Sequence, residues 1–293
     1  SVVVVSEQNH GEKATQSLWR LPLDGGPAVD LGVAGSRVRK PDWLSDGSGL
    51  VFEWDKRSFS DIFRVTITEA VPTRLTAAEG GSFDPAVSPS GDSLAFASSR
   101  DGNAEIYVQG LHDGVVTRLT TDPGDDSRPA WISAGRLAWI GVRGGKSLLF
   151  ATNREGSGTQ QLFPANPTVA GSAPSEMGQP TPEVIDFAVC PAASRVAVVT
   201  RSVARDVPAN VDIVVIEIGL DDQLRLDSVE VGRVATAEQE DTPAWSLDCT
   251  MLAYSKGKSP EVWLSEYTGA DARSLAKGWL PRWAPPRERA LRN

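Results

Sequence analysis

The sequence PDWLSDG at residues 41–47 decides the fold, because versions of it return along the whole chain. The copies return about every 45 residues, which is the period of an array built from one supersecondary unit. The other copies are PAVSPSG at 85–91, PAWISAG at 129–135, PAWSLD at 243–248 and PRWAP at 281–285, with a weaker one, FAVCP, at 187–191.

The second repeat shows most clearly what one unit encodes. After a short extended run at 86–88, residues 93–98, 105–109 and 116–120 are rich in apolar, β-branched and aromatic side chains, a pattern typical of strands. Turn sequences such as Asp101-Gly102 separate them. Four short antiparallel strands per unit predict a propeller blade. The recurring tryptophan is expected to pack between neighbouring blades, at Trp43, Trp131, Trp245 and Trp283.

The repeats predict an all-β fold, a six-bladed β-propeller of four-stranded antiparallel blades in a single domain, residues 1–293. The last repeat has room for one inner strand only, whereas residues 1–38 read as the outer three strands of a blade. We therefore expect the two ends of the chain to share one blade, which would remove an exposed sheet edge. The predicted blades span approximately 39–81, 82–126, 127–168, 183–240, 241–278, and 279–293 plus 1–38, with a long loop at 164–182.

The composition excludes some classes of partner. The chain has 29 Lys and Arg against 38 Asp and Glu, a net charge of −9, which argues against a nucleic-acid groove. No apolar run reaches transmembrane length, and no signal-peptide pattern opens the chain. Because the chain starts inside a predicted strand, we expect a trimmed or mature form whose leader is not visible. A monomer is expected.

The two cysteines, Cys190 and Cys249, fall in an inner strand and in the first turn of the following blade. A disulfide between neighbouring blades is one alternative. Two separate, buried and inert thiols are the preferred expectation, and the pattern alone does not decide the redox compartment.

The repeated phrase resembles that of the TolB-like (TolB-type, WD-repeat-like) propellers. The match is strongest in residues 85–120, through Ser99-Arg100-Asp101-Gly102, Ile106-Tyr107 and Arg118-Leu119-Thr120. It is good in residues 41–76, through Asp61-Ile62-Phe63 and Arg74-Leu75-Thr76. The resemblance covers the whole chain at the level of repeats and implies the propeller fold.

For function, this resemblance implies several roles. TolB proteins act in the bacterial cell envelope through protein contacts, including contacts with a peptidoglycan-associated lipoprotein. Similar propellers precede the catalytic domain of prolyl-oligopeptidase-like enzymes, and some are polysaccharide lyases. The resemblance therefore implies a periplasmic, secreted or cell-envelope location. We expect a propeller-only chain without the N-terminal domain of TolB proteins.

Three other patterns of potential chemistry have structural interpretations. Gly91-Asp92-Ser93-Leu94 spells a serine-esterase signature, but the repeat places it on a turn between two strands. His10 and His112 fall in loops predicted to lie on opposite faces, so a shared triad or metal site is not expected. We expect no cofactor and no metal; calcium at the acidic residues 122–126 is the alternative, since calcium favours oxygen-rich loops.

The candidate site is the mouth of the central channel, where the loops that enter each inner strand meet the hairpins between second and third strands. The charged residues there are Arg39, Lys40, Asp84, Arg128, Asp186 and Asp241. Two insertions, 164–182 and 201–210, are expected to project to the same face.

The first hypothesis is a non-catalytic scaffold that binds a protein or peptide partner, or a small polar ligand, through this face. The second is a hydrolase or lyase in which Asp84, Asp186 or Asp241 does acid–base work and Arg39 or Arg128 stabilises charge. The third is an accessory propeller of a larger sensor, kinase or peptidase.

Overall fold

The computed structural model describes residues 2–10, 13–21, 26–35, 37–55, 59–164, 182–190, 192, 194–202, 210–220, 226–234, 240–246, 248–257 and 261–277. The chain divides into two compact units. The described part of unit 1 ends at Arg118, and that of unit 2 runs from Leu119 to Lys277. Each unit is built of antiparallel β-sheets.

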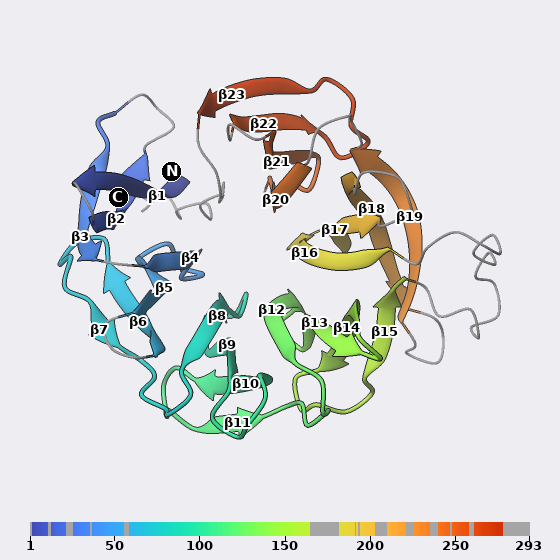
Figure 1. Cartoon of the computed structure of the whole chain (residues 1–293), viewed down its shortest axis with the longest axis horizontal. Helices are drawn as coiled ribbons and strands as arrows, with labels where there is room; N and C mark the ends of the chain where they lie inside the picture. The colour runs from blue at the N-terminus through green and yellow to red at the C-terminus, as the bar shows by residue number, and fades with distance from the viewer. Residues whose placement is uncertain are drawn as a thin grey trace, which may run out of the picture. The chain divides into compact units, whose positions relative to one another are not determined.

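In its described residues, unit 1 holds one three-stranded sheet and two four-stranded sheets, each with its strands side by side in chain order (Figure 1). The strands of the first sheet are β1 (Val2–His10), β2 (Lys13–Leu21) and β3 (Val29–Gly35). Those of the second are β4 (Val38–Trp43), β5 (Gly49–Asp55), β6 (Ser60–Thr66) and β7 (Thr73–Arg74). Those of the third are β8 (Ser82–Val87), β9 (Ser93–Ser98), β10 (Glu105–Gly110) and β11 (Val116–Arg118).

The described part of unit 2 holds three four-stranded sheets of the same topology. The first consists of β12 (Asp126–Ser133), β13 (Arg136–Arg143), β14 (Lys146–Asn153) and β15 (Gln160–Phe163). The second consists of β16 (Glu183–Cys190), β17 (Arg195–Ser202), β18 (Asn210–Leu220) and β19 (Leu226–Val234). The third consists of β20 (Glu240–Trp245), β21 (Met251–Lys256), β22 (Glu261–Glu266) and β23 (Arg273–Lys277).

Each four-stranded sheet is a propeller blade, and its second strand carries the core. Every residue of β9 is buried, because neighbouring strands pair with both of its edges and other side chains cover both of its faces. Phe96 and Trp139 of these second strands are at most 1 % exposed and stack on Tyr107 and Phe150 of the third strands.

The recurring tryptophan packs between neighbouring blades, as predicted, at Trp43 and Trp245. Trp43 lies in one apolar cluster with Leu18 and Leu31 of the preceding sheet. Trp245 packs on the preceding blade as well, and its indole Nε1 donates a hydrogen bond of 3.0 Å to the backbone oxygen of Ala188 in β16. Trp283 lies outside the described residues.

The described residues form five four-stranded blades, not the six that the repeat predicts. The sheet β1–β2–β3 corresponds to the predicted outer strands of the sixth blade, with somewhat different bounds. The residues predicted to complete it, 279–293, lie outside the described part of the chain. The six-blade count therefore stays a prediction.

The expectation of two separate thiols is wrong. Cys190, the last residue of β16, and Cys249, in the turn after β20, form a disulfide with Cα atoms 5.8 Å apart. Both residues are buried, at 3 % and 0 % exposure. The repeat had placed them in neighbouring blades, but it contains no signal for the distance between the two turns.

Candidate functional site

The predicted site residues lie at a recurrent irregularity of the first strands. The pairing of first and second strands shifts register between Arg39 and Asp42, between Phe83 and Ala86, between Ser127 and Ala130, and between Asp241 and Ala244. Such bulges redirect side chains at the ends of sheets. In each bulge one residue has a positive φ, and these residues are Lys40, Asp84, Arg128 and Thr242.

The proline that opens each repeat explains the bulge. It follows Lys40, Asp84, Arg128 and Thr242 directly. Proline has no backbone N–H to donate to a ladder, so within sheets it is found at edges and bulges. The left-handed conformation of a non-glycine residue is uncommon and carries strain. The bulge with its positive φ thus sets the direction of three of the six predicted site residues, Lys40, Asp84 and Arg128.

Blade 4, the sheet β16–β19, departs from this rule. It has no proline at this point, and its bulge contains the single residue Ile185, between Val184 and Asp186. Phe187 stands where the other blades have the proline, and Asp186 therefore matches Lys40, Asp84, Arg128 and Thr242, since Ala188 opposite Ala197 corresponds to Asp42 opposite Val51. Asp186 is thus at the position that the sequence alignment expects, although it lacks the positive φ of its counterparts.

In unit 1, Arg39 lies at the centre of a first charged cluster that also contains Glu53, Asp55 and Ser60. Its Nη2 is 2.6 Å from Glu53 Oε1 and 3.5 Å from Asp55 Oδ1. The hydroxyl of Ser60 donates to both carboxylates. The backbone N–H of Asp84 lies 3.5 Å from Glu53 Oε2. Strands β4, β5, β6 and β8 thus bring Arg39 and Asp84 together around Glu53.

Glu53 is a buried carboxyl at only 4 % exposure. Burial raises the pKa of Glu53, because the charged form loses its hydration, and the nearby charge of Arg39 opposes this effect. Arg39 itself is 43 % exposed. The cluster therefore contains a half-exposed guanidinium, that of Arg39, held by an ion pair with the buried carboxyl of Glu53.

The raised pKa predicts how the stability of unit 1 responds to pH. The folded state binds the Glu53 proton more tightly than the unfolded state does, so this contribution is fully present below the unfolded value, about 4.3. It is lost as pH rises through the folded pKa. We expect the wild-type free energy of unfolding to fall relative to that of Glu53→Gln between pH 4 and pH 7. Urea denaturation of both proteins across this range would measure it; the exposed-site variant Glu230→Gln is the control, and an opposite slope would contradict the prediction.

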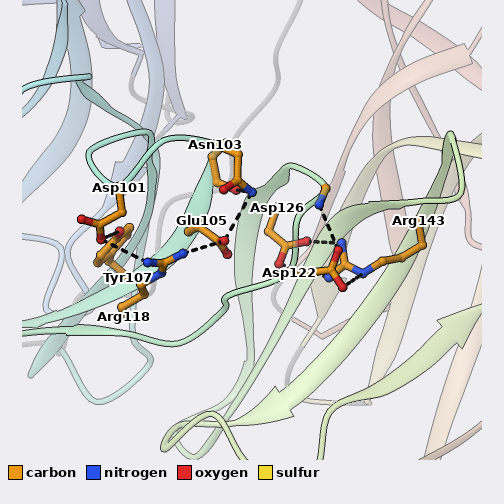
Figure 2. A network of polar contacts seen from close by, with 10 residues as sticks. Asp101, Asn103, Glu105, Tyr107, Arg118, Asp122, Asp126 and Arg143 are labelled. Carbon is orange, nitrogen blue, oxygen red and sulfur yellow. Dashed lines mark hydrogen bonds and ion pairs between the residues drawn. The ribbon is translucent and has the colours of Figure 1, made fainter.

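Blade 2, the sheet β8–β11, carries a second polar network (Figure 2). Arg118 Nη2 is 2.8 Å from Glu105 Oε1, and Glu105 is fully buried. The Tyr107 hydroxyl donates to Asp101, whose carboxylate also lies 3.4 Å from Arg118 Nη1. Burial, and then the hydrogen bond to Asp101, raise the pKa of Tyr107 to about 12. The network joins the hairpin after β9 to the outer strand β11.

In unit 2, a second charged cluster consists of Asp122, Asp126 and Arg143 (Figure 2). Arg143 binds both oxygens of the fully buried Asp126, at 2.8 and 3.2 Å, and its Nε lies 3.0 Å from Asp122 Oδ2. Nearby in sequence, Arg128 Nη1 lies 2.7 Å from Asp186 Oδ1, which joins the first strands of two neighbouring blades. Arg128 is 36 % exposed, and Asp186 is 15 % exposed.

The structure thus brings together some of the predicted site residues and leaves others untested. Arg39 and Asp84 meet at Glu53, and Arg128 meets Asp186. Asp241 is placed by its backbone only, opposite Ser255 in β21. The predicted loop 164–182 and hairpin 201–210 fall largely outside the described residues.

The patterns with structural interpretations can be placed as well. Ser93 of the esterase-like sequence is fully buried, and its N–H donates to the Ser88 hydroxyl within the turn. His112 is exposed in the turn after β10, and His10 ends β1. Two of the three acids at 122–126 bind Arg143. Within the described part of the chain, no group of three or more His, Cys, Asp or Glu residues is placed to hold a metal ion, and no helix is long and apolar enough to cross a membrane.

Sequence reasoning missed the acids that bind the arginine of the Arg-Leu-Thr motif, Arg74 or Arg118. The signal was present in the two best repeats, where an acid is the first or second residue of the third strand and an arginine follows 13 residues later. These pairs are Asp61 with Arg74, 2.5 Å apart, and Glu105 with Arg118. The threonine of the same motif is structural too, since Thr76 Oγ1 accepts a hydrogen bond from the N–H of Ile62.

Comparison with known proteins agrees with this architecture. Residues 1–178 match the family described as TolB beta propeller domain. Over 104 residues the chain is 32 % identical to a protein TolB homolog of Chlamydia muridarum, a match covering 34 % of this chain and 24 % of that protein. It is 30 % identical over 114 residues to the uncharacterized peptidase YuxL of Bacillus subtilis, covering 36 % of this chain and 17 % of that protein. The chain thus matches about a quarter or less of the length of these relatives.

Among solved structures, TolB from Acinetobacter baumannii superposes with a TM-score of 0.70 at 18 % identity. The superposition covers 97 % of this chain and 67 % of that one. At this level of identity the likeness concerns the fold.

Proposed function

The chain belongs to the TolB beta propeller domain family, and we propose that it is a non-catalytic scaffold that binds a protein or peptide partner. The proposed contact residues lie on the first strands of each unit, namely Arg39, Lys40 and Asp84 in unit 1 and Arg128, Asp186 and Asp241 in unit 2. A hydrolase or lyase site with the same residues, and an accessory role in a larger protein, stay predictions.

The observation that carries the proposal is the way in which the arginines are held. Arg39 and Arg128 are 43 % and 36 % exposed, yet each guanidinium is fixed within 2.7 Å of a carboxylate. A partly exposed guanidinium recognises carboxylates and backbone oxygens with defined geometry. Because its side chain is already ordered, it loses less conformational entropy on binding.

The disulfide supports an oxidising location for this scaffold. Structural disulfides persist in secreted proteins and in the bacterial periplasm and are rare in the cytosol. We therefore propose a periplasmic, secreted or cell-envelope location, in keeping with the family resemblance.

We further propose that the sheet β1–β2–β3 is completed as a sixth blade by residues 279–293. Within the described residues β1 pairs with a strand on one edge only. Trp43 supports the same assignment. Its indole Nε1 is buried without an acceptor among the described residues, whereas the corresponding nitrogen of Trp245 donates to the first strand of the preceding blade.

The binding surface is tested by charge reversal with a matched control. Wild-type chain, Arg39→Glu, Arg128→Glu and the control Glu217→Arg are immobilised and exposed to a bacterial envelope extract. Glu217 is a suitable control because its partner, Arg195, is the first residue of β17 and pairs with Cys190, four residues beyond Asp186 in β16. We expect a protein retained by wild type and control to bind at least about tenfold more weakly to the two arginine variants.

Equal retention of that protein by all four chains would contradict the proposed surface. Retention of none would contradict the scaffold function. Circular dichroism of each variant establishes that the fold is kept.

A further inference from the structure

Cys249 occupies a backbone position that glycine occupies in two other blades. In three blades, the turn after the first strand is closed by a hydrogen bond from the backbone N–H of its fourth residue to the backbone oxygen of its first. The fourth residue is Gly47, Gly91 or Cys249, with bond lengths of 2.8, 2.9 and 3.0 Å. All three have positive φ, of 68°, 73° and 57°. Glycine adopts this conformation freely, whereas a side chain makes it strained.

This position also faces the preceding blade closely. A Cβ built on Gly91 would lie 2.3 Å from the hydroxyl oxygen of Ser45, in the turn after β4. In blade 5, the sheet β20–β23, the neighbour of the corresponding residue is Cys190 at the end of β16, and the two are covalently joined. A cysteine here therefore combines a strained backbone with a crowded side chain, and a covalent bond to the neighbour accommodates both.

We propose that the Cys190–Cys249 bond is a redox-dependent staple that holds the turn of blade 5 on blade 4, so that the folded state of unit 2 depends on oxidation. Two thiols lose two protons and two electrons as the sulfur–sulfur bond forms. A disulfide of the thiol-exchange class accepts them and is reduced to two thiols. Because Cys190 and Cys249 are 3 % and 0 % exposed, the exchange takes place before the turn packs, and the finished bond is protected.

Two matched variants separate the effect of the disulfide bond from the effect of a side chain at a position of positive φ. Cys190→Ser/Cys249→Gly removes the bond and restores the glycine of the other blades. Cys190→Ser/Cys249→Ser removes the bond and keeps a side chain at positive φ. We expect the Tm to fall in the order oxidised wild type, glycine variant, serine variant. The bond closes a loop with a sequence separation of 59 residues, so its loss should lower the Tm by about 5–10 °C.

Each full-length chain is unfolded, refolded with or without dithiothreitol, and then heated to measure its Tm. The reductant should bring wild type close to the serine variant and leave both variants unchanged. An unchanged wild-type Tm, or a serine variant as stable as the glycine variant, would overturn the proposal. Titration of the cysteine thiols provides a second readout that does not need a folded variant. In native wild type, dithiothreitol should not reduce the Cys190–Cys249 bond until denaturant is added. Free cysteine thiols without denaturant would contradict the protected bond.

Discussion

Arg143→Ala is expected to lower the free energy of unfolding of unit 2 by about 3–5 kcal/mol, because it leaves a buried carboxylate without its partner. Asp126 has no exposed surface, and both of its oxygens bind the guanidinium of Arg143. That guanidinium also lies 4.8 Å from the ring centre of Phe150, so packing is lost together with charge. Urea denaturation followed by tryptophan fluorescence measures the change.

The matched control is Arg201→Ala in the same unit, whose ion pair with Glu183 leaves the two side chains 46 % and 34 % exposed. Exposed pairs contribute about 0–1 kcal/mol, so little change is expected there. Asp126→Asn should recover part of the loss in the Arg143→Ala background, because an amide is less costly to bury unpaired than a carboxylate. If the losses of the two single variants simply add in the double variant, the ion pair is not what stabilises this end of the blade.

The repeated phrase predicts the blades because each of its residues has one structural task. Its proline is accommodated in a bulge, its tryptophan fills the space between sheets, and its glycine permits a turn at positive φ. These tasks are local or involve the neighbouring repeat, so a single sequence reveals them. In the same way, the buried Ser93 follows from its place on a turn, whatever motif its neighbours spell.

The site is less predictable because its geometry depends on contacts between residues far apart in the chain. Placing the charges beside the proline identifies Arg39 and Arg128, but nothing local shows that Glu53 lies beneath one and Asp186 opposite the other. Blade 4 keeps Asp186 at the expected position without a proline after it, and only the strand register reveals this. The disulfide likewise depends on how closely two turns approach.

Deleting residues 279–293 is expected to produce the largest loss of stability, because these residues are proposed to complete the sixth blade. The deletion would leave β1, which begins with the apolar sequence VVVV, with an open edge. Open apolar edges pair with other chains, so a lower Tm should be accompanied by association. Thermal unfolding and light scattering measure the two effects. Deleting residues 288–293 alone, which keeps the PRWAP copy, is the control and should change little.

Trp43→Phe tests the same closure with a single hydrogen bond. If the buried indole N–H of Trp43 donates to an oxygen of the C-terminal segment, its removal costs about 1 kcal/mol in the full chain. The same substitution should cost less in the deletion variant, because the acceptor is already absent there. A double-mutant cycle of Trp43→Phe with the deletion gives the coupling energy. A coupling of zero, or a deletion variant as stable as the full chain, would show that the sheet β1–β2–β3 is not closed by residues 279–293.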